Sequence, residues 1–235
     1  MIFNDYDFSP YLRCNPTRSV LPPINVKATE VSNKDGDIFE TATLGSMTIE
    51  VSARLCYRGN EQPMEVRRKL AAMLYSTTPA KLVLDDDPTR YYAAILGGES
   101  QLDNLWRTGK ADLTFICNDP IAYGASVSID IRGVLDLSVG GTYKSYPTIT
   151  AVPAANTSYW RITETTSGDY IQINHAFNGT QTVVIDCENQ SATLDGASAG
   201  IDVVLASNFF ALAPGHTSLK TSSGAATVAY IERWL

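Results

Sequence analysis

The chain has 235 residues, of which 18 are basic and 25 are acidic, for a formal net charge of −7. This length allows one large or two small domains with a buried core and excludes a disulfide-stapled peptide. The acidic balance disfavours a surface that binds nucleic-acid phosphates. The N-terminus lacks a secretory signal and no apolar run is long enough for a membrane span, so we expect synthesis that ends in a cytoplasm, without membrane insertion.

Charge usage changes near Gly124. Residues 1–124 hold 29 charged side chains and residues 125–235 hold 14, while serine and threonine rise from 17 to 25. A Thr-rich stretch with few charges is typical of an all-β unit. We therefore expect two domains, residues 1–124 and 125–235.

The clearest predicted elements of the first domain are a strand and a helix that follows it. Residues 47–57 alternate apolar and polar side chains, which predicts a strand with one buried face. In residues 63–76, the spacing of Val66, Leu70 and Leu74 predicts one amphipathic helix of about four turns. Its outer face carries a charged cluster that we interpret as solvated or subunit-facing. The cluster consists of Glu65, Arg67, Arg68 and Lys69.

A strand pair and a further strand follow. Residues 82–84 and 91–96 flank an Asp-Pro-rich segment, residues 85–90, which favours a turn between two strands. Leu102, Leu105 and Trp106 suggest a short helical turn. Residues 113–117 alternate as another strand, which ends before Pro120.

An earlier segment, residues 29–45, has a different character. It contains Asp35-Gly36 between modestly β-prone flanks. Few of its side chains are large and apolar, so it has little to bury in a core. We expect a projecting hairpin or arm there.

The second domain consists of repeated short strands separated by turn residues such as Asn178-Gly179 and Asp195-Gly196. The expected strands are residues 127–131, 160–163, 170–177, 182–187, 203–206 and 227–231. No helical periodicity competes with this pattern. An antiparallel β-sandwich is the expected fold.

One motif resembles that of serine hydrolases. Residues 196–200 read Gly-Ala-Ser-Ala-Gly, but a nucleophile elbow needs a helix directly after Ser198. Residues 201–205 look like another strand instead, which favours a small-residue hairpin loop. His175 and His216 are available for a triad, yet His175 shares a strand face with two isoleucines, as a core or rim histidine does. We expect no enzyme and no catalytic residue.

Metal and cofactor sites are also not expected. Neither residues 85–87 nor residues 33–37 have the spacing of a calcium loop. The chain has no Gly-rich phosphate motif. The four cysteines form no Cys-x-x-Cys pair, so mostly buried, reduced thiols are the simpler interpretation. They are Cys14, Cys56, Cys117 and Cys187.

Aromatic residues in the second domain leave two interpretations open. Most Trp and Tyr side chains in strands are partly buried core residues with a polar tip. The alternative is a glycan-binding module that recognises host-surface polysaccharide, with Trp160 or Trp234 as the stacking platform. The aromatic set is Tyr143, Tyr146, Tyr159, Trp160, Tyr170 and Trp234.

Two segments carry a family resemblance. Residues 82–92 read LVLDDDPTRYY and residues 109–120 read GKADLTFICNDP. In this order and spacing they closely resemble the distal tail proteins of long non-contractile-tailed phages and prophages. Shorter segments that fit are YPTI at 146–149, IDCEN at 185–189, LAPG at 212–215 and ERWL at 232–235. The second domain departs from the family pattern at residues 215–217.

The resemblance implies a structural virion protein at the tail tip. The N-terminal domain is expected to be a tail-tube-like β-sandwich with one α-helix and a projecting hairpin, and to build a ring, most often of six copies. The C-terminal domain is expected to be a galectin-like antiparallel β-sandwich that points outward. The arm and the charged helix face are the nominated interfaces.

The resemblance also implies partners. The major tail tube protein stacks on one ring face and the tail-tip spike or tail-associated lysin on the other, with receptor-binding or baseplate proteins at the periphery. DNA passes through the channel without specific binding. From the net charge of −7 per chain, we expect a negatively charged lumen that repels the DNA.

Overall fold

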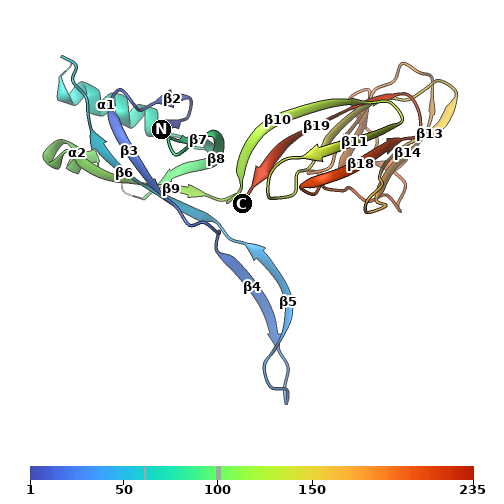
Figure 1. The fold of residues 1–235 in the computed structure, drawn as a ribbon, viewed down its shortest axis with the longest axis horizontal. Helices are drawn as coiled ribbons and strands as arrows, with labels where there is room; N and C mark the ends of the chain where they lie inside the picture. The colour runs from blue at the N-terminus through green and yellow to red at the C-terminus, as the bar shows by residue number, and fades with distance from the viewer. Residues whose placement is uncertain (61, 99–101) are drawn as a thin grey trace. The chain divides into compact units, whose positions relative to one another are not determined.

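The computed structural model describes residues 1–60, 62–98 and 102–235 and is mainly β. The chain divides into two compact units, Met1–Ala122 with Leu235, and Tyr123–Trp234 (Figure 1). We call them unit 1 and unit 2. Neither helix among the described residues is long and apolar enough to cross a membrane.

The described residues of unit 1 form nine strands and two helices. In chain order they are β1 (Ile2–Phe3), β2 (Tyr6–Asp7), β3 (Leu12–Thr17), β4 (Ile24–Glu30), β5 (Asp37–Leu44), β6 (Met47–Leu55), α1 (Pro63–Leu74), β7 (Ala80–Leu84), β8 (Asp87–Gly97), α2 (Leu102–Thr108) and β9 (Lys110–Cys117). The expected helical turn is thus a short second helix, although the side chains of Leu102 and Trp106 lie outside the described residues.

The long strand β8 joins two sheet portions of unit 1. Its first part pairs with β7 and its last part with β9, which gives the orders β2-β1-β7-β8 and β8-β9-β6-β3. The rings of Phe3 and Phe115 pack across the interior with centroids 5.0 Å apart. The alternation in β6 is confirmed, because Met47, Ile49 and Val51 are buried and the residues between them are exposed. The alternating pattern therefore predicted the buried face of this strand correctly, and the mainly β fold of unit 1 agrees with what the family resemblance implied.

Helix α1 confirms the predicted amphipathic pattern. Val66, Leu70 and Leu74 are buried, and Pro63 occupies the first helical turn, where its missing N–H is not needed. The helix ends two residues before the expected end. Tyr75 is already extended, since the Ser-Thr-Thr-Pro segment after it favours non-helical backbone.

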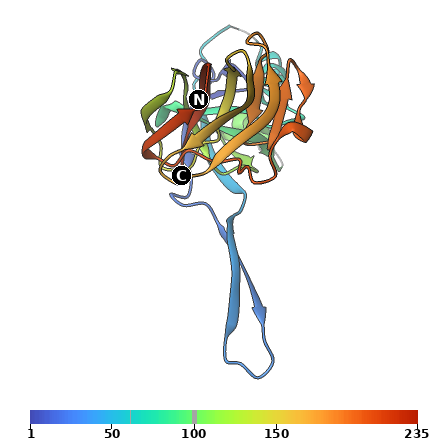
Figure 2. The same ribbon diagram turned by 90° about the vertical axis from the view of Figure 1, so that its right-hand side faces the viewer.

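The hairpin of β4 and β5 pairs with no other described strand. Figures 1 and 2 show it leaving the remainder of unit 1. All of its strand residues are exposed except Leu44, which is half-buried. The predicted arm therefore exists, but it starts at Ile24 and not at residue 29, because residues 24–28 also extend away from the core, although Ile24 and Val26 are apolar.

Unit 2 follows from β10 and forms two antiparallel sheets. Its elements are β10 (Ala122–Ile131), β11 (Val134–Val139), β12 (Thr148–Val152), β13 (Thr157–Glu164), β14 (Tyr170–Phe177), β15 (Val183–Asp186), β16 (Ser191–Leu194), β17 (Ala197–Ser198), the 3₁₀ helix η1 (Gly200–Asp202), β18 (Gly215–Thr221) and β19 (Ala225–Trp234). One sheet has the order β17-β16-β15-β12-β19-β10 and the other β11-β18-β13-β14. The predicted sandwich is confirmed.

The core of unit 2 lies between the two sheets. Trp160 and Ile162 on β13 and Ile185 on β15 are fully buried in it. The Trp160 Nε1–H donates a 3.0 Å hydrogen bond to the Ser223 carbonyl, which satisfies the only polar atom of the indole. This side chain is therefore a core residue.

One expected strand is wrong. Residues 203–206 form no strand, and only Val203 makes an isolated bridge, to Ile173. Ile201 and Leu205 flank the bridge and are 96% and 104% exposed. The apolar run that suggested a strand thus has no sheet to join.

Candidate functional site

The hairpin of β4 and β5 is the first candidate interface. Lys27 Nζ pairs with Glu40 Oε2 at 2.9 Å, and the Thr29 hydroxyl also donates to Glu40. These hydrogen bonds, that of Thr29 foremost, lower the pKa of Glu40. Farther out, Glu30 and Asp37 stand directly opposite each other. The contacts of Glu40 therefore hold the two strands of the hairpin together, and negatively charged side chains lie nearer its tip.

The charged face of α1 is the second candidate. Glu65, Arg68 and Lys69 are exposed and Arg67 is half-buried. Arg68 Nη1 lies 3.3 Å from Glu65 Oε1, an i, i+3 pair on the helix surface. Such an exposed pair contributes little stability. The face is available to solvent or to a neighbour, as the sequence suggested.

The three aspartates at the junction of β7 and β8, two in the turn and one at the start of β8, pair with cations of the same unit. The Met1 amino group pairs with Asp85, Arg18 with Asp86 at 2.6 Å, and Arg90 with Asp87 at 2.8 Å. Within the part of the chain that the structure describes, no group of three or more His, Cys, Asp or Glu side chains is arranged to hold a metal ion. The run serves to close the turn.

The serine motif lacks the setting of a nucleophile elbow. Ser198 ends the two-residue edge strand β17, and a three-residue 3₁₀ helix follows in place of an α-helix. His175 Nε2 lies 3.0 Å from Gln181 Nε2, and its Nδ1 lies 3.6 Å from Asp202 Oδ2. His216 is exposed on β18. The histidine nearest this loop is thus engaged with residues other than the serine, while the absence of catalytic residues stays a prediction.

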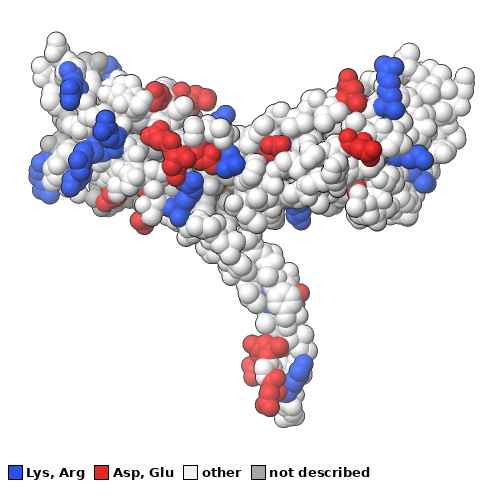
Figure 3. All heavy atoms as spheres, viewed as in Figure 1, with Lys and Arg blue, Asp and Glu red and all other residues white. Residues whose placement is uncertain are grey.

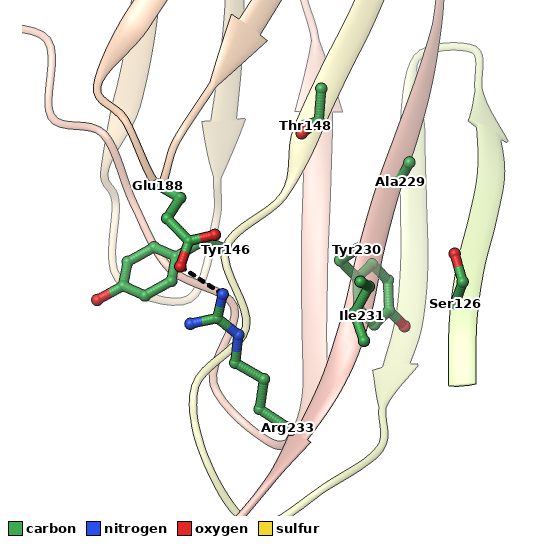
Figure 4. Close-up of a pocket in the computed structure, with 8 residues that line it drawn as sticks. All are labelled: Ser126, Tyr146, Thr148, Glu188, Ala229, Tyr230, Ile231 and Arg233. Atoms are coloured by element: carbon green, nitrogen blue, oxygen red, sulfur yellow. Dashed lines mark hydrogen bonds and ion pairs between the residues drawn. The ribbon is translucent and has the colours of Figure 1, made fainter. Parts of the chain in front are cut away.

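Unit 2 contains a pocket of about 200 Å³ beside β19. Figure 4 shows the Arg233 guanidinium pointing toward Glu188, with the Tyr146 ring next to them. Arg233 Nη2 donates to Glu188 Oε1 at 2.5 Å, and the guanidinium carbon lies 5.1 Å from the Tyr146 ring centre and 5.3 Å from that of Tyr123. The other residues of the wall are Ser126, Thr148, Ala229, Tyr230 and Ile231.

The charged group of this pocket already has partners within unit 2. Arg233 is 8% exposed, and its charge is balanced by Glu188 and by the electron-rich faces of two tyrosines. The arrangement fixes the end of β19. Trp160, one of the two stacking platforms considered for a glycan, is wrong for that role because it is fully buried.

Comparisons with known proteins cover both units. Residues 3–117 match the family described as phage tail protein RIFT-related domain, and residues 140–234 match the siphovirus-type tail component, C-terminal domain. The distal tail protein of Bacillus phage SPP1 is 23% identical over 241 residues, which span 100% of this chain and 95% of that protein. The chain belongs to the distal tail protein family of siphophages. The relatives of this chain are structural proteins of the phage tail.

Solved structures agree with the fold of the family. The crystal structure of SPP1 Dit, described as a paradigm of the hub adsorption apparatus in phages that infect Gram-positive bacteria, has a TM-score of 0.78 at 20% identity, over 100% of this chain and 98% of that one. The phage p2 baseplate in its activated conformation with Sr contains a chain with a TM-score of 0.50 at 9% identity, over 96% and 92%. The two-domain β fold is thus shared along the full chain.

The sequence did not reveal every feature of these surfaces. The pocket at Arg233 combines residues from β10, β12, β19 and two turns, so no local motif encodes it. The segments at 146–149, 185–189 and 232–235 that carried part of the resemblance contribute Tyr146, Glu188 and Arg233 to it. The family resemblance was the only available signal for this cluster.

Proposed function

We propose that this distal tail protein forms a hexameric ring at the tail tip and joins the tail tube to the tail-tip spike or tail-associated lysin. Unit 1 builds the ring, unit 2 provides attachment for receptor-binding proteins, and DNA passes through the central channel. The observation that carries this proposal is the full-length match to SPP1 Dit, a hub protein by its description.

The exposed residues of the hairpin are evidence for the proposed ring. β4 and β5 bury almost nothing within their own unit, although Ile24, Val26, Ile38 and Phe39 are apolar and 45–64% exposed. Exposed apolar side chains on a projecting element are typical of a surface that a partner covers. In a ring, each hairpin clasps a neighbouring subunit.

The composition supports a permanent assembly. Charged residues are only 18% of the chain, and charged residues are depleted in the cores of interfaces. A closed ring also covers strand edges that otherwise invite aggregation. The net charge of −7 per chain keeps the passing DNA unbound if the lumen shares it.

Co-expression tests the connecting role. The chain is produced with the tail tube protein and the tail-tip spike protein encoded by the same phage, and complexes are purified through a tag on the tube protein. We expect a complex of all three proteins only when this chain is present. Recovery of the tube and spike together without it would refute the proposed role.

A further inference from the structure

The exposed face of one sheet of unit 1 carries a row of like charges. Arg13 on β3 lies directly opposite Arg54 on β6, and Arg54 lies directly opposite Lys110 on β9. All three are exposed, and residues that are directly paired across strands project from the same face. We call these three residues the basic row. Like charges in such positions repel each other and destabilise the sheet, so the row favours a negatively charged partner.

Two other charged residues lie near the basic row. Asp112 follows Lys110 by two residues on β9 and accepts a 2.8 Å hydrogen bond from Ser52, which lies directly opposite it on β6. Arg107 at the end of α2 shares a pocket wall with Lys110 and adds further positive charge. Among the described residues, no ion pair joins any member of the basic row to a carboxylate. The surface is also hollowed, since a pocket of about 290 Å³ is lined by Arg54 and Lys110 together with Asp112.

The tip of the hairpin has the opposite charge pattern. Glu30 and Asp37 form the last pair of β4 and β5 and face each other directly. Asp35 lies in the turn between them, with Lys34 as the one basic residue of that turn. We call Glu30, Asp35 and Asp37 the acidic tip. Figure 3 shows acidic atoms gathered at the end of the hairpin, and basic atoms gathered over the part of unit 1 where α2 lies.

We propose that the acidic tip of one copy docks on the basic row of a second copy. This contact rests on the proposed ring and names the surface that receives each hairpin. Both surfaces carry like charges at directly opposed positions, and each supplies the counter-charge that the other lacks. Pairing them removes two repulsions at once.

The position of the basic row favours a contact between copies. Arg54 lies near the end of β6, whereas the hairpin joins the start of β6 through Gly45. At about 3.3 Å per residue, the strand separates the hairpin base from Arg54 by roughly 25 Å. The hairpin leaves from that base and points away from the strand in Figure 1. A contact from one surface to a different surface of the next copy is head-to-tail, the type that closes into rings.

Cross-linking between labelled copies tests the contact. Unlabelled and ¹⁵N-labelled chains are mixed at high salt, returned to low salt and treated with a water-soluble carbodiimide, which joins a lysine amine to a carboxylate that touches it. We expect mass spectrometry to find Lys110 linked to Asp35, Asp37 or Glu30, with linked peptides that combine both isotopes. Links found only within one isotope would mean that the hairpin folds back on its own chain, and would overturn the proposal.

Charge reversal provides a second test. The row variant Arg54→Glu/Lys110→Glu and the tip variant Asp35→Lys/Asp37→Lys should each weaken self-association at least tenfold. An equal mixture of the two should restore it, because each tip then meets a row of opposite charge. Lys220→Glu, at an exposed position in unit 2, is the matched control and should change nothing. If the row variant does not fold, Arg54→Gln replaces it, which keeps the Lys110 amine in place and should still lower the yield of the cross-link at Lys110.

The outcomes separate this contact from the proposed function. An annulus in electron micrographs without the mixed-isotope link leaves the ring intact and refutes the docking. The link without an annulus supports the docking and refutes ring closure by the chain alone. A row variant that assembles normally but binds DNA or the tube protein less well assigns the row to one of those partners and overturns the proposal.

Discussion

Arg233 Nη2 donates a 2.5 Å hydrogen bond to Glu188 Oε1, which ties the last strand of unit 2 to the turn after β15. The side chain of Arg233 is 10% exposed, while that of Glu188 is 52% exposed. Arg233 therefore contributes through packing against Tyr123 and Tyr146 as well as through charge.

Replacing this arginine should destabilise unit 2. We expect Arg233→Ala to lower the free energy of unfolding by about 2 kcal/mol, because it leaves aromatic faces unfilled and removes a mostly buried donor. Glu188→Gln should cost less, since solvent screens the exposed partner. Urea denaturation monitored by circular dichroism measures both. Equal effects of the two variants would contradict the packing contribution.

Glu164 should make unit 2 sensitive to acid. Burial raises its pKa, but hydrogen bonds from Ser167, Thr217 and Thr166 outweigh burial and lower the pKa from 4.5 to about 2. A depressed pKa in the folded state gives stability that is present above the unfolded value near 4.5. That stability is lost as the pH falls through about 2, and amounts to at most about 3 kcal/mol.

The measurement is the free energy of unfolding against pH for the wild type and Glu164→Gln. The variant should be less stable at pH 7 and should lose less stability between pH 4.5 and 2. Asp136→Asn, at an exposed position, serves as the control and should keep the wild-type profile. A Glu164→Gln profile as steep as that of the wild type would contradict the assignment.

Much of the fold was predictable because an element with one buried face has apolar residues at regular spacing in the sequence. β6 and α1 each place apolar residues on one face, as in Ile49 and Val51 or Val66 and Leu70. This pattern fails where apolar residues stay exposed. The sequence pattern did not show that the hairpin begins at Ile24. The apolar residues after Ile201 predicted a strand at residues 203–206, where the structure has none.

The basic row shows a second limit of sequence analysis. Arg13, Arg54 and Lys110 are far apart in the chain and become neighbours only through the register of β3, β6 and β9. Register depends on tertiary pairing, which one sequence does not specify locally. The same holds for the cluster around Arg233. The family could be identified from sequence segments, but these surfaces needed the structure.

Thiol reactivity should single out Cys56. It is exposed, whereas Cys117 and Cys187 are buried. Burial raises the pKa of both buried thiols to about 12, and that of Cys14 to about 11. Because the thiolate is the reactive form, Ellman's reagent should modify one thiol quickly in the native protein. Cys56→Ser should abolish this fast phase, and a fast phase that persists in the variant would contradict the assignment.

Removing the hairpin should leave both units folded. The Gly45 N–H donates to the Pro23 carbonyl at 2.7 Å, so a short Gly-rich turn can replace residues 24–44 at this closed base. At a concentration where the wild-type chain is monomeric, we expect the free energy of unfolding to change by no more than about 0.5 kcal/mol, because the removed strands bury almost no surface within one chain. Thermal and urea unfolding measure this. A large loss of stability would show that the hairpin belongs to the core of unit 1.

The native mass of the purified chain tests the central claim most directly. Sedimentation over a wide concentration range, with negative-stain images of the heaviest species, should give six times the 25.5 kDa of one chain and an annulus. The variant without the hairpin should remain monomeric under the same conditions. A wild-type chain that stays monomeric at every concentration, also when tube and spike proteins are added, would contradict the ring.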